Sequence, residues 1–299
     1  MKNLKKLLIG ILVFALALGT LTACQSNEPA EDSQKTEEQN EEKQNEGNNA
    51  EQDEPKDLEK ITVAASPTPH AEILAQVKDA LAEKGYELEV IEYTDYVQPN
   101  LVVDSGEIVA NFFQHGPYLN NFNEEQGTKL VSVAPIHYEP LGVYAGKSAD
   151  LASIPEGGAI AVPNDTTNEA RALLLLEANG VIRLKEGAGL LATKNDIAEN
   201  PKNIDIVELE AAQVSRVIGE VDFVVLNGNY ALNAGLKVAD AVAKEEQESE
   251  AAQTYANLVV VREGNENKED VKALVEALKS DEVKQFIADT YAGAVVAID

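Results

Sequence analysis

The chain has 299 residues and a formal net charge of −28, because 52 acidic side chains outnumber 24 lysines and arginines. This length suggests about two lobes, each able to bury a core of its own. Beyond the first six residues no basic stretch could neutralise a phosphate backbone, which excludes nucleic-acid binding. The single cysteine, Cys24, excludes an intramolecular disulfide and any zinc site that needs two cysteines.

The first 24 residues have the pattern of a lipoprotein leader. Three of the first six residues are lysines, an apolar run follows from Leu7 to Leu21, and the sequence LTAC at 21–24 resembles a bacterial lipobox. The apolar run is short for a membrane span, which favours cleavage over an uncleaved transmembrane anchor. We therefore predict a signal peptide over 1–23 and a lipid on Cys24, with the protein anchored at the extracytoplasmic face of the cell membrane.

Residues 24–59 are predicted to form a disordered acidic tether. This stretch consists of Glu, Gln, Asn, Asp and Lys with almost no large apolar side chain. Such a segment cannot bury enough apolar surface to offset the loss of chain entropy on folding. We interpret it as the connection between the lipid and the folded body.

The folded body is predicted to begin with a buried strand over 61–65. Thr68 and Pro69 then have the pattern of a helix start, and apolar side chains recur at the helical period until Gly85 stops the helix. Further strands are predicted over 87–93, 108–113, 130–136 and 141–144, with helices over 97–104 and 117–125.

The alternation of strand and helix continues to the C-terminus. Strands are predicted over 159–162, 204–209, 222–226 and 256–261, with helices over 168–178, 211–218, 230–234, 268–279 and 281–291. This alternation indicates an α/β fold. We predict a first lobe from 60–143 plus 257–299 and a second lobe from 144–256.

Nothing in the sequence favours catalysis, a metal site or a resident cofactor. His70, His115 and His137 are far apart and have no metal-site spacing, which argues against a metal receptor. The chain has no GxSxG elbow, P-loop or GxGxxG motif, and Cys24 is assigned to the lipid. We therefore expect a protein that is not an enzyme, with no catalytic residues, no metal and no cofactor.

Two strand-to-helix junctions carry side chains suited to a binding site. Residues 111–118 mix aromatic rings with polar groups, although ordinary edge packing would explain that equally well. Residues 163–171 end a strand and start a helix, where free backbone N–H groups favour an anion. Arg171, one turn inside this helix, could hold a carboxylate in a bidentate pair, although a surface arginine taken alone is the commoner case.

These segments resemble the methionine-binding lipoproteins of ABC importers, the NlpA or MetQ family. The resemblance covers almost the whole body from about residue 61 to the C-terminus. The chain departs from the family pattern at Thr166, where a proline is common, and at Glu169-Ala170, which replace other residues ahead of Arg171. The matching runs are 66–74, 96–100, 110–119, 163–171, 199–202, 207–212 and 226–231.

The resemblance implies a two-lobed fold like that of type II periplasmic binding proteins, with the ligand in a cleft between the lobes. Aromatic residues would surround a thioether side chain, Arg171 would hold the ligand's α-carboxylate, and Asn227 would accept a hydrogen bond from its ammonium group. The residues expected to bind the ligand are Tyr96, Phe113, His115, Tyr118, Asn168, Arg171 and Asn227.

The resemblance also implies the role and the partners. The protein would capture L-methionine or a related amino acid, deliver it to the permease and ATPase of an ABC importer, and act as a monomer. A receptor for another amino acid, a short methionine-containing peptide or a metal ion remains an alternative. An anchored enzyme on the same fold and a surface adhesin are further alternatives, although no nucleophile or base set supports the enzyme.

Overall fold

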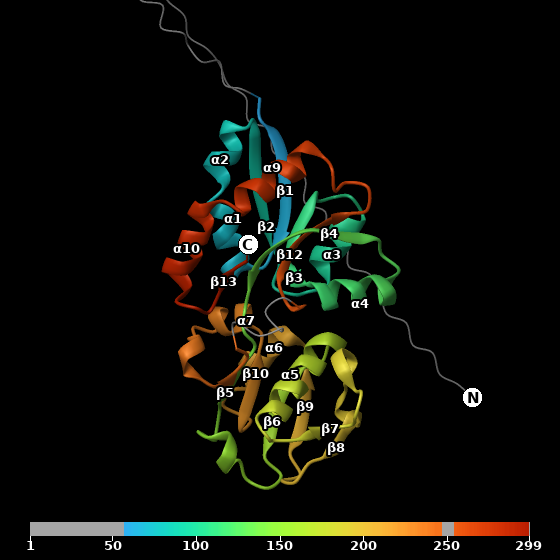
Figure 1. Ribbon diagram of the computed structural model, residues 1–299, viewed down its shortest axis with the longest axis vertical. Coiled ribbons are helices and arrows are strands. Elements are labelled where there is room, and N and C mark those ends of the chain that lie inside the picture. Colours follow the sequence, from blue (N-terminus) through green and yellow to red (C-terminus); the bar gives the residue numbers. More distant parts are fainter. Residues whose placement is uncertain (1–56, 247–253, 299) are drawn as a thin grey trace, which may run out of the picture. The chain divides into compact units, whose positions relative to one another are not determined.

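The computed structural model describes residues 57–246 and 254–298. The predicted signal peptide, Cys24 and nearly all of the predicted tether therefore lie outside the described residues. Within the described ranges, no helix is both long enough and apolar enough to cross a membrane. Most strands of this part belong to two separate sheets, which are connected by crossing segments (Figure 1).

The first sheet has six strands in the order β13-β4-β12-β3-β1-β2. Strand β1 pairs in parallel with β2 and β3, whereas β12 pairs antiparallel with β3 and β4. Strands from the C-terminal end of the chain thus complete the sheet that the N-terminal end begins. The strands are β1 (Glu59–Ala65), β2 (Tyr86–Glu92), β3 (Ala110–His115), β4 (Leu130–Tyr138), β12 (Asn257–Arg262) and β13 (Val296–Ala297).

The second sheet has five strands in the order β11-β5-β10-β6-β9. Its strand β5 spans the predicted lobe boundary between residues 143 and 144, and the predicted lobe limits stay a prediction. The short strands β7 (Arg183–Leu184) and β8 (Ile197–Glu199) form a separate pair. The sheet strands are β5 (Gly142–Ala145), β6 (Ala159–Pro163), β9 (Asp205–Leu209), β10 (Phe223–Leu226) and β11 (Ala241–Lys244).

Helices cover both faces of the first sheet, and together they form what we call lobe 1. Alternate residues of β1 face opposite sides, so that Val63 lies in the larger core and Ala64 in the smaller one. The larger core packs against α1 (Glu72–Ala75), α2 (Lys78–Glu83), α9 (Glu269–Leu278) and α10 (Asp281–Tyr291), the smaller against α3 (Gln98–Asp104) and α4 (Gly116–Gln126).

The second sheet and its helices form lobe 2 in the same manner. Helix α5 (Thr166–Ala178) packs on one face with Val162, while α6 (Ala211–Val214) and α7 (Gly228–Asn233) pack on the other with Ala161. Short turns of 3-10 helix connect the elements of this lobe. They are η2 (Leu151–Ser153), η3 (Gly189–Leu191), η4 (Lys194–Asp196), η5 (Ser215–Val217) and η6 (Val238–Asp240).

The helix predicted to start at Thr68 is broken in the structure. A short π-type turn, η1 (Pro67–Ala71), precedes α1 and α2, and Thr68 itself is extended with φ −126° and ψ 134°. Contact with the ring of the following proline favours this extended conformation, which is also usual for an N-cap residue. The Thr68 hydroxyl, however, donates to Glu72 Oε1 at 2.6 Å. Gly85 ends the helical region as predicted, with a φ of +92° that favours glycine.

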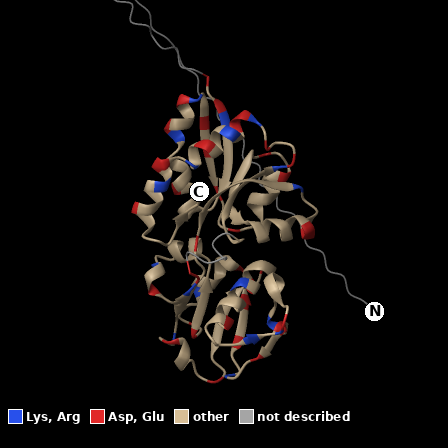
Figure 2. Ribbon diagram, viewed as in Figure 1, with Lys and Arg blue, Asp and Glu red and all other residues tan. Residues whose placement is uncertain are grey.

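Charged side chains are interspersed on the outer helices. Figure 2 shows acidic and basic residues along α2, α9 and α10, and the acidic residues are more numerous over the chain as a whole. Dispersed charge of this kind favours solubility.

Candidate ligand-binding site

One buried cavity lies between residues of the two lobes. All the residues that the sequence predicted to bind a ligand line this cavity, so the structure brings the whole predicted set together. The sequence analysis missed further lining residues, namely Gln114, Glu139, Gly228, Asn229 and Asn257.

Lobe 1 contributes an aromatic wall. The ring of Tyr96 lies 5.7 Å from that of Phe113 and 5.8 Å from that of Tyr118, between centroids. Phe113 and His115 alternate with Phe112 and Gln114 along β3, and α4 begins directly after His115, which places Tyr118 beside the strand end. The Tyr118 hydroxyl donates to the backbone oxygen of Tyr96 at 3.0 Å. The wall therefore packs on itself and is held by a hydrogen bond of its own.

His115 joins the aromatic wall to lobe 2. Its Nδ1 accepts from the backbone N–H of Tyr118 at 3.2 Å, which leaves the proton on Nε2. Nε2–H then donates to Asn168 Oδ1 at 3.1 Å. Burial, followed by the nearby Arg171 charge, lowers the pKa of His115 to about 3, so the ring is neutral.

Lobe 2 contributes a wall of amides. Asp165 caps α5 by accepting from the backbone N–H of Asn168 at 3.1 Å, and it also accepts from the Asn168 side chain at 2.9 Å. Asn168 Oδ1 accepts from Asn227 Nδ2 at 2.7 Å. Asn227 Oδ1 is buried and, among the described residues, has no hydrogen-bond donor. A buried acceptor of this kind is available to a ligand donor.

Arg171 is 4% exposed and is already paired on one edge. Its Nε and Nη2 donate to the two carboxylate oxygens of Glu245 at 2.8 and 2.6 Å, and Nη2 also donates to the Glu139 backbone oxygen at 3.0 Å. Burial alone would raise the pKa of Glu245, but Arg171 outweighs it and the pKa is lowered. The bidentate edge that the sequence predicted to hold a ligand carboxylate is therefore already occupied by Glu245.

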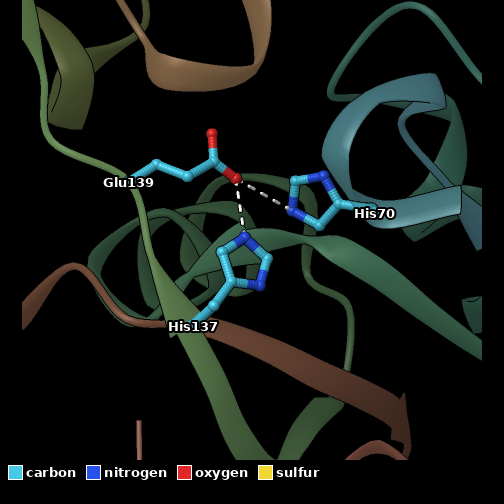
Figure 3. Close-up of side chains that lie close together, drawn as sticks. All are labelled: His70, His137 and Glu139. Carbon is cyan, nitrogen blue, oxygen red and sulfur yellow. Dashed lines mark hydrogen bonds and ion pairs between the residues drawn. The ribbon is translucent and has the colours of Figure 1, made fainter. Parts of the chain in front are cut away.

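A second buried group lies at the end of β4. Figure 3 shows the rings of His70 and His137 pointing at one oxygen of Glu139. His137 Nε2 lies 2.7 Å and His70 Nε2 lies 3.4 Å from Glu139 Oε1, and the three side chains are at most 5% exposed. His70 Nε2 also contacts Asn257 Oδ1 at 2.9 Å.

His70 and His137, although far apart in the sequence, therefore lie side by side in the structure, with ring centroids 4.9 Å apart. His137 and Glu139 are two residues apart at a strand end and face the same side, and this spacing could have identified them from the sequence. Burial lowers the pKa of His70 to about 4 and of His137 to about 3. Burial also raises the pKa of Glu139, against the opposing effects of His70 and Arg171.

Direct hydrogen bonds join the two lobes around the cavity. The Tyr96 hydroxyl donates to Asn229 Oδ1 at 2.6 Å, and the Tyr230 hydroxyl donates to the Thr94 backbone oxygen at 3.0 Å. The enclosed free volume is about 20 Å³, enough for a water molecule and too small for an amino acid. A ligand can therefore enter this site only when the lobes move apart.

Comparison with known proteins places these features in a family context. The family model described as NlpA lipoprotein matches residues 61–298. The D-methionine-binding lipoprotein MetQ of Salmonella typhimurium is 42% identical over 228 residues, which are 75% of this chain and 83% of that protein.

Two solved structures resemble the fold over most of the chain. A putative lipoprotein from Ruminococcus gnavus is 63% identical with a TM-score of 0.80, covering 81% of this chain and 100% of that one. A nutrient-binding protein from Burkholderia cenocepacia, solved with methionine bound, is 46% identical with a TM-score of 0.76, covering 80% and 100%.

Proposed function

This chain belongs to the NlpA lipoprotein family, and on that premise we propose that it captures L-methionine between its two lobes and delivers it to an ABC importer. The family resemblance and the two-lobed α/β fold predicted from the sequence are both confirmed. The ligand is inferred from the relatives, one named for D-methionine binding and one solved with methionine bound.

The observation that carries the proposal is the convergence of all the predicted ligand residues on one buried cavity. Tyr96, Phe113 and Tyr118 supply aromatic surfaces for a thioether, a contact worth about 0.3 to 1.5 kcal/mol. His115 lies at the edge of this wall and, being neutral, adds no charge beside the sulfur.

The polar ends of methionine are assigned to lobe 2. Arg171 holds the α-carboxylate, with the amide of Asn168 beside it. Asn227 accepts from the ammonium group through Oδ1. The proposal is supported by the position of Arg171 on the cavity wall and by the unpartnered oxygen of Asn227, because a zwitterion in a closed cleft needs a partner for each charge.

The location and partners complete the proposal. Cleavage after residue 23 leaves Cys24 as a lipid-bearing N-terminus, and residues 24–59 connect it to lobe 1 (60–143 plus 257–299) and lobe 2 (144–256). The chain acts as a monomer at the extracytoplasmic face of the membrane. Its closed form docks on a permease whose ATPase drives transport, and no covalent bond of the ligand changes.

Calorimetry with L-methionine on the full chain tests this proposal. We expect one ligand per chain, and native mass spectrometry should show the corresponding mass increment, lost on denaturation. Other amino acids, methionine-containing dipeptides and divalent metal ions serve as competitors. Failure of L-methionine to bind, with tight binding of a competitor, would replace the ligand and retain the receptor; turnover of a bound ligand would overturn the non-enzymatic role.

A further inference from the structure

The cavity contains a buried carboxylate that has no cationic side chain paired with it. The charged residues that line the cavity are Glu139 and Arg171, and the guanidinium of Arg171 already forms a bidentate pair with Glu245. His70 and His137, which contact Glu139, are neutral because burial lowers the pKa of each. A buried carboxylate with only neutral donors around it remains a strong attractor for a cation.

His137 holds this carboxylate as a hydrogen-bond donor, and His70, whose Nε2–H donates to Asn257, packs beside it. His137 Nε2 lies 2.7 Å from Glu139 Oε1, a hydrogen-bond distance, and His70 Nε2 faces the same oxygen and Asn257 Oδ1. Glu139 and Asn257 contact the two rings through Nε2, so each neutral ring carries its proton on Nε2. Both Nδ1 atoms are buried and, in the described part of the chain, have no hydrogen-bond partner.

The same geometry argues against a metal ion held by these three side chains. Two ligands at about 2.0 to 2.2 Å from a tetrahedral ion are more than 3 Å apart, whereas His137 Nε2 and Glu139 Oε1 are 2.7 Å apart. Ligation through Nε2 would also move each proton to Nδ1. Two buried N–H groups would then have no acceptor among the described residues, which is more costly than two unused acceptor nitrogens.

Gly228 leaves room for the carboxylate at the cavity. A Cβ atom at this position would lie 2.8 Å from Glu139 Oε2 and 2.6 Å from Glu139 Cβ, too close for any side chain. Oε2 points away from both histidine rings (Figure 3). The carboxylate thus uses one oxygen for the histidines, while the other lies against a glycine that itself lines the cavity.

We propose that Glu139 is the counter-ion for the positively charged amino group of the ligand, with His137 positioning its carboxylate. This inference rests on the proposed function and narrows the ligand class. The site binds amino acids or short peptides that carry a free, protonated amino group. In an amino acid this group lies next to the ligand's carboxylate, and in a peptide it lies at the end of the ligand's backbone. Ligands whose amine is acylated or missing are excluded, because Glu139 would be left buried without its cation.

The test compares matched ligands on the full chain by calorimetry. L-methionine, N-acetyl-L-methionine and 4-(methylthio)butanoate differ only at the amine. We expect the wild-type chain to prefer L-methionine by about 100-fold or more over both analogues. In Glu139→Gln, which keeps the shape and removes the charge, we expect that preference to fall below about 10-fold. An unchanged preference in Glu139→Gln overturns the proposal.

The positioning role is tested at His137. His137→Gln keeps an N–H donor near Glu139 and should retain most of the preference for the amine, whereas His137→Leu should lose it. Thermal melting separates this loss from unfolding. Equal losses for L-methionine and 4-(methylthio)butanoate in His137→Leu would mean that the residue is only structural, and would overturn the positioning role.

Two control variants keep the assignment specific. Glu125→Gln removes an exposed carboxylate of α4 near α5 and should leave the preference unchanged. Asp165→Asn removes another buried carboxylate while keeping a side chain that can cap α5. Loss of the amine preference in Asp165→Asn, with retention in Glu139→Gln, would assign the counter-ion to Asp165 instead.

The remaining outcomes separate this inference from the proposed function. If L-methionine does not bind but another amino acid does, the function fails, and the matched des-amino acid still tests Glu139. If no amine binds to the wild-type chain, both fail. Stoichiometric binding of Zn²⁺ or Mn²⁺ that Glu139→Gln abolishes would identify a metal site and overturn the inference.

Discussion

The two walls of the cavity start from similar backbone and end with different chemistry. Each is built where a strand runs into a helix, β3 into α4 in lobe 1 and β6 into α5 in lobe 2. The lobe 1 wall consists mainly of aromatic rings that contact one another, whereas the lobe 2 wall consists of amides and a guanidinium. The same strand-to-helix architecture can therefore supply an aromatic surface in one lobe and polar groups in the other, while Glu139, at the end of β4, adds a charge from lobe 1.

The two walls also differ in how many of their buried groups lack a partner within the protein. The rings of lobe 1 form a small hydrophobic cluster of their own, so their packing is complete within the lobe. In lobe 2, the buried atoms Asn227 Oδ1 and Asn229 Nδ2 have no hydrogen-bond partner in the described part of the chain. A ligand contributes most to the wall that has unused polar groups, because unpaired buried groups are costly.

The strongest way to break the polar wall is Arg171→Ala. We expect binding of L-methionine to weaken by about 2–5 kcal/mol, because the ligand carboxylate would be buried without a partner. Calorimetry measures this change. Since Arg171 also pairs with Glu245, the double variant Arg171→Met/Glu245→Gln serves as the control for stability. Unchanged affinity in Arg171→Ala would contradict the assigned carboxylate contact.

A smaller effect on the same wall is expected from Asn227→Ala. It removes the unpartnered oxygen and the donor to Asn168, and we expect binding to weaken by about 1.5–3 kcal/mol, the range for a hydrogen bond to a charged group. The exposed amide Asn195→Ala is the matched control in lobe 2. If both variants bind L-methionine equally well, Asn227 has no ligand contact.

Acid should act on lobe 1, because all three histidines of the chain lie there. Their folded-state pKa values are about 4 for His70 and about 3 for His115 and His137, below the ordinary 6.5. As the pH falls below 6.5 the unfolded chain binds protons that the folded chain does not, so the free energy of unfolding decreases. At pH 5 this amounts to about 2 kcal/mol for each histidine.

Glu139, whose pKa burial raises, acts in the opposite direction and offsets part of this loss. Urea denaturation at pH 7 and pH 5 measures the net change, and amide exchange should show earlier opening of β1, β3 and β4 than of β6 and β10. An equal increase in amide exchange in both sheets at pH 5 would contradict the assignment of acid sensitivity to lobe 1.

The smallest effect should come from the contact between the walls. Tyr96→Phe removes the hydroxyl that donates to Asn229 Oδ1 and keeps the aromatic ring. We expect a loss of about 0.5–1.5 kcal/mol in binding, the usual net value of one hydrogen bond. Tyr93→Phe, on the same lobe and outside the cavity, is the control. A loss above this range would show that the ring itself has been displaced.

Local sequence patterns predicted most of the helices and strands. They failed where contacts with the rest of the fold determine the backbone conformation. Strands such as β1 and β10 combine apolar, β-branched residues, and their positions were predicted to within two residues. The single helix predicted from Thr68 to Gly85 is divided into η1, α1 and α2, although the apolar period continues across the divisions. Strand β11 was missed because its four residues, AVAK, include only one β-branched side chain and are too few to show a period.

The prediction that the ligand residues share one cavity came from the family resemblance. Local sequence patterns alone would not have connected them. The partner of Arg171 could not be predicted, since Glu245 is 74 residues away in the chain and lies in an acidic stretch that resembles a linker. Glu139 was missed because carboxylates are common in this chain. Its spacing of two residues from His137 was the available sequence signal, whereas the meeting of His70, on η1, with His137, on β4, is visible only in the structure.

The closed arrangement of the cavity has a kinetic consequence. Because hydrogen bonds from Tyr96 and Tyr230 join the lobes across the site, we expect a captured solute to leave only after these contacts break. Its residence time is then limited by the rate at which the lobes separate. Solutes that bind with very different affinities should therefore have dissociation rates that do not exceed the rate of lobe separation. A docked permease can accelerate release by speeding this one step.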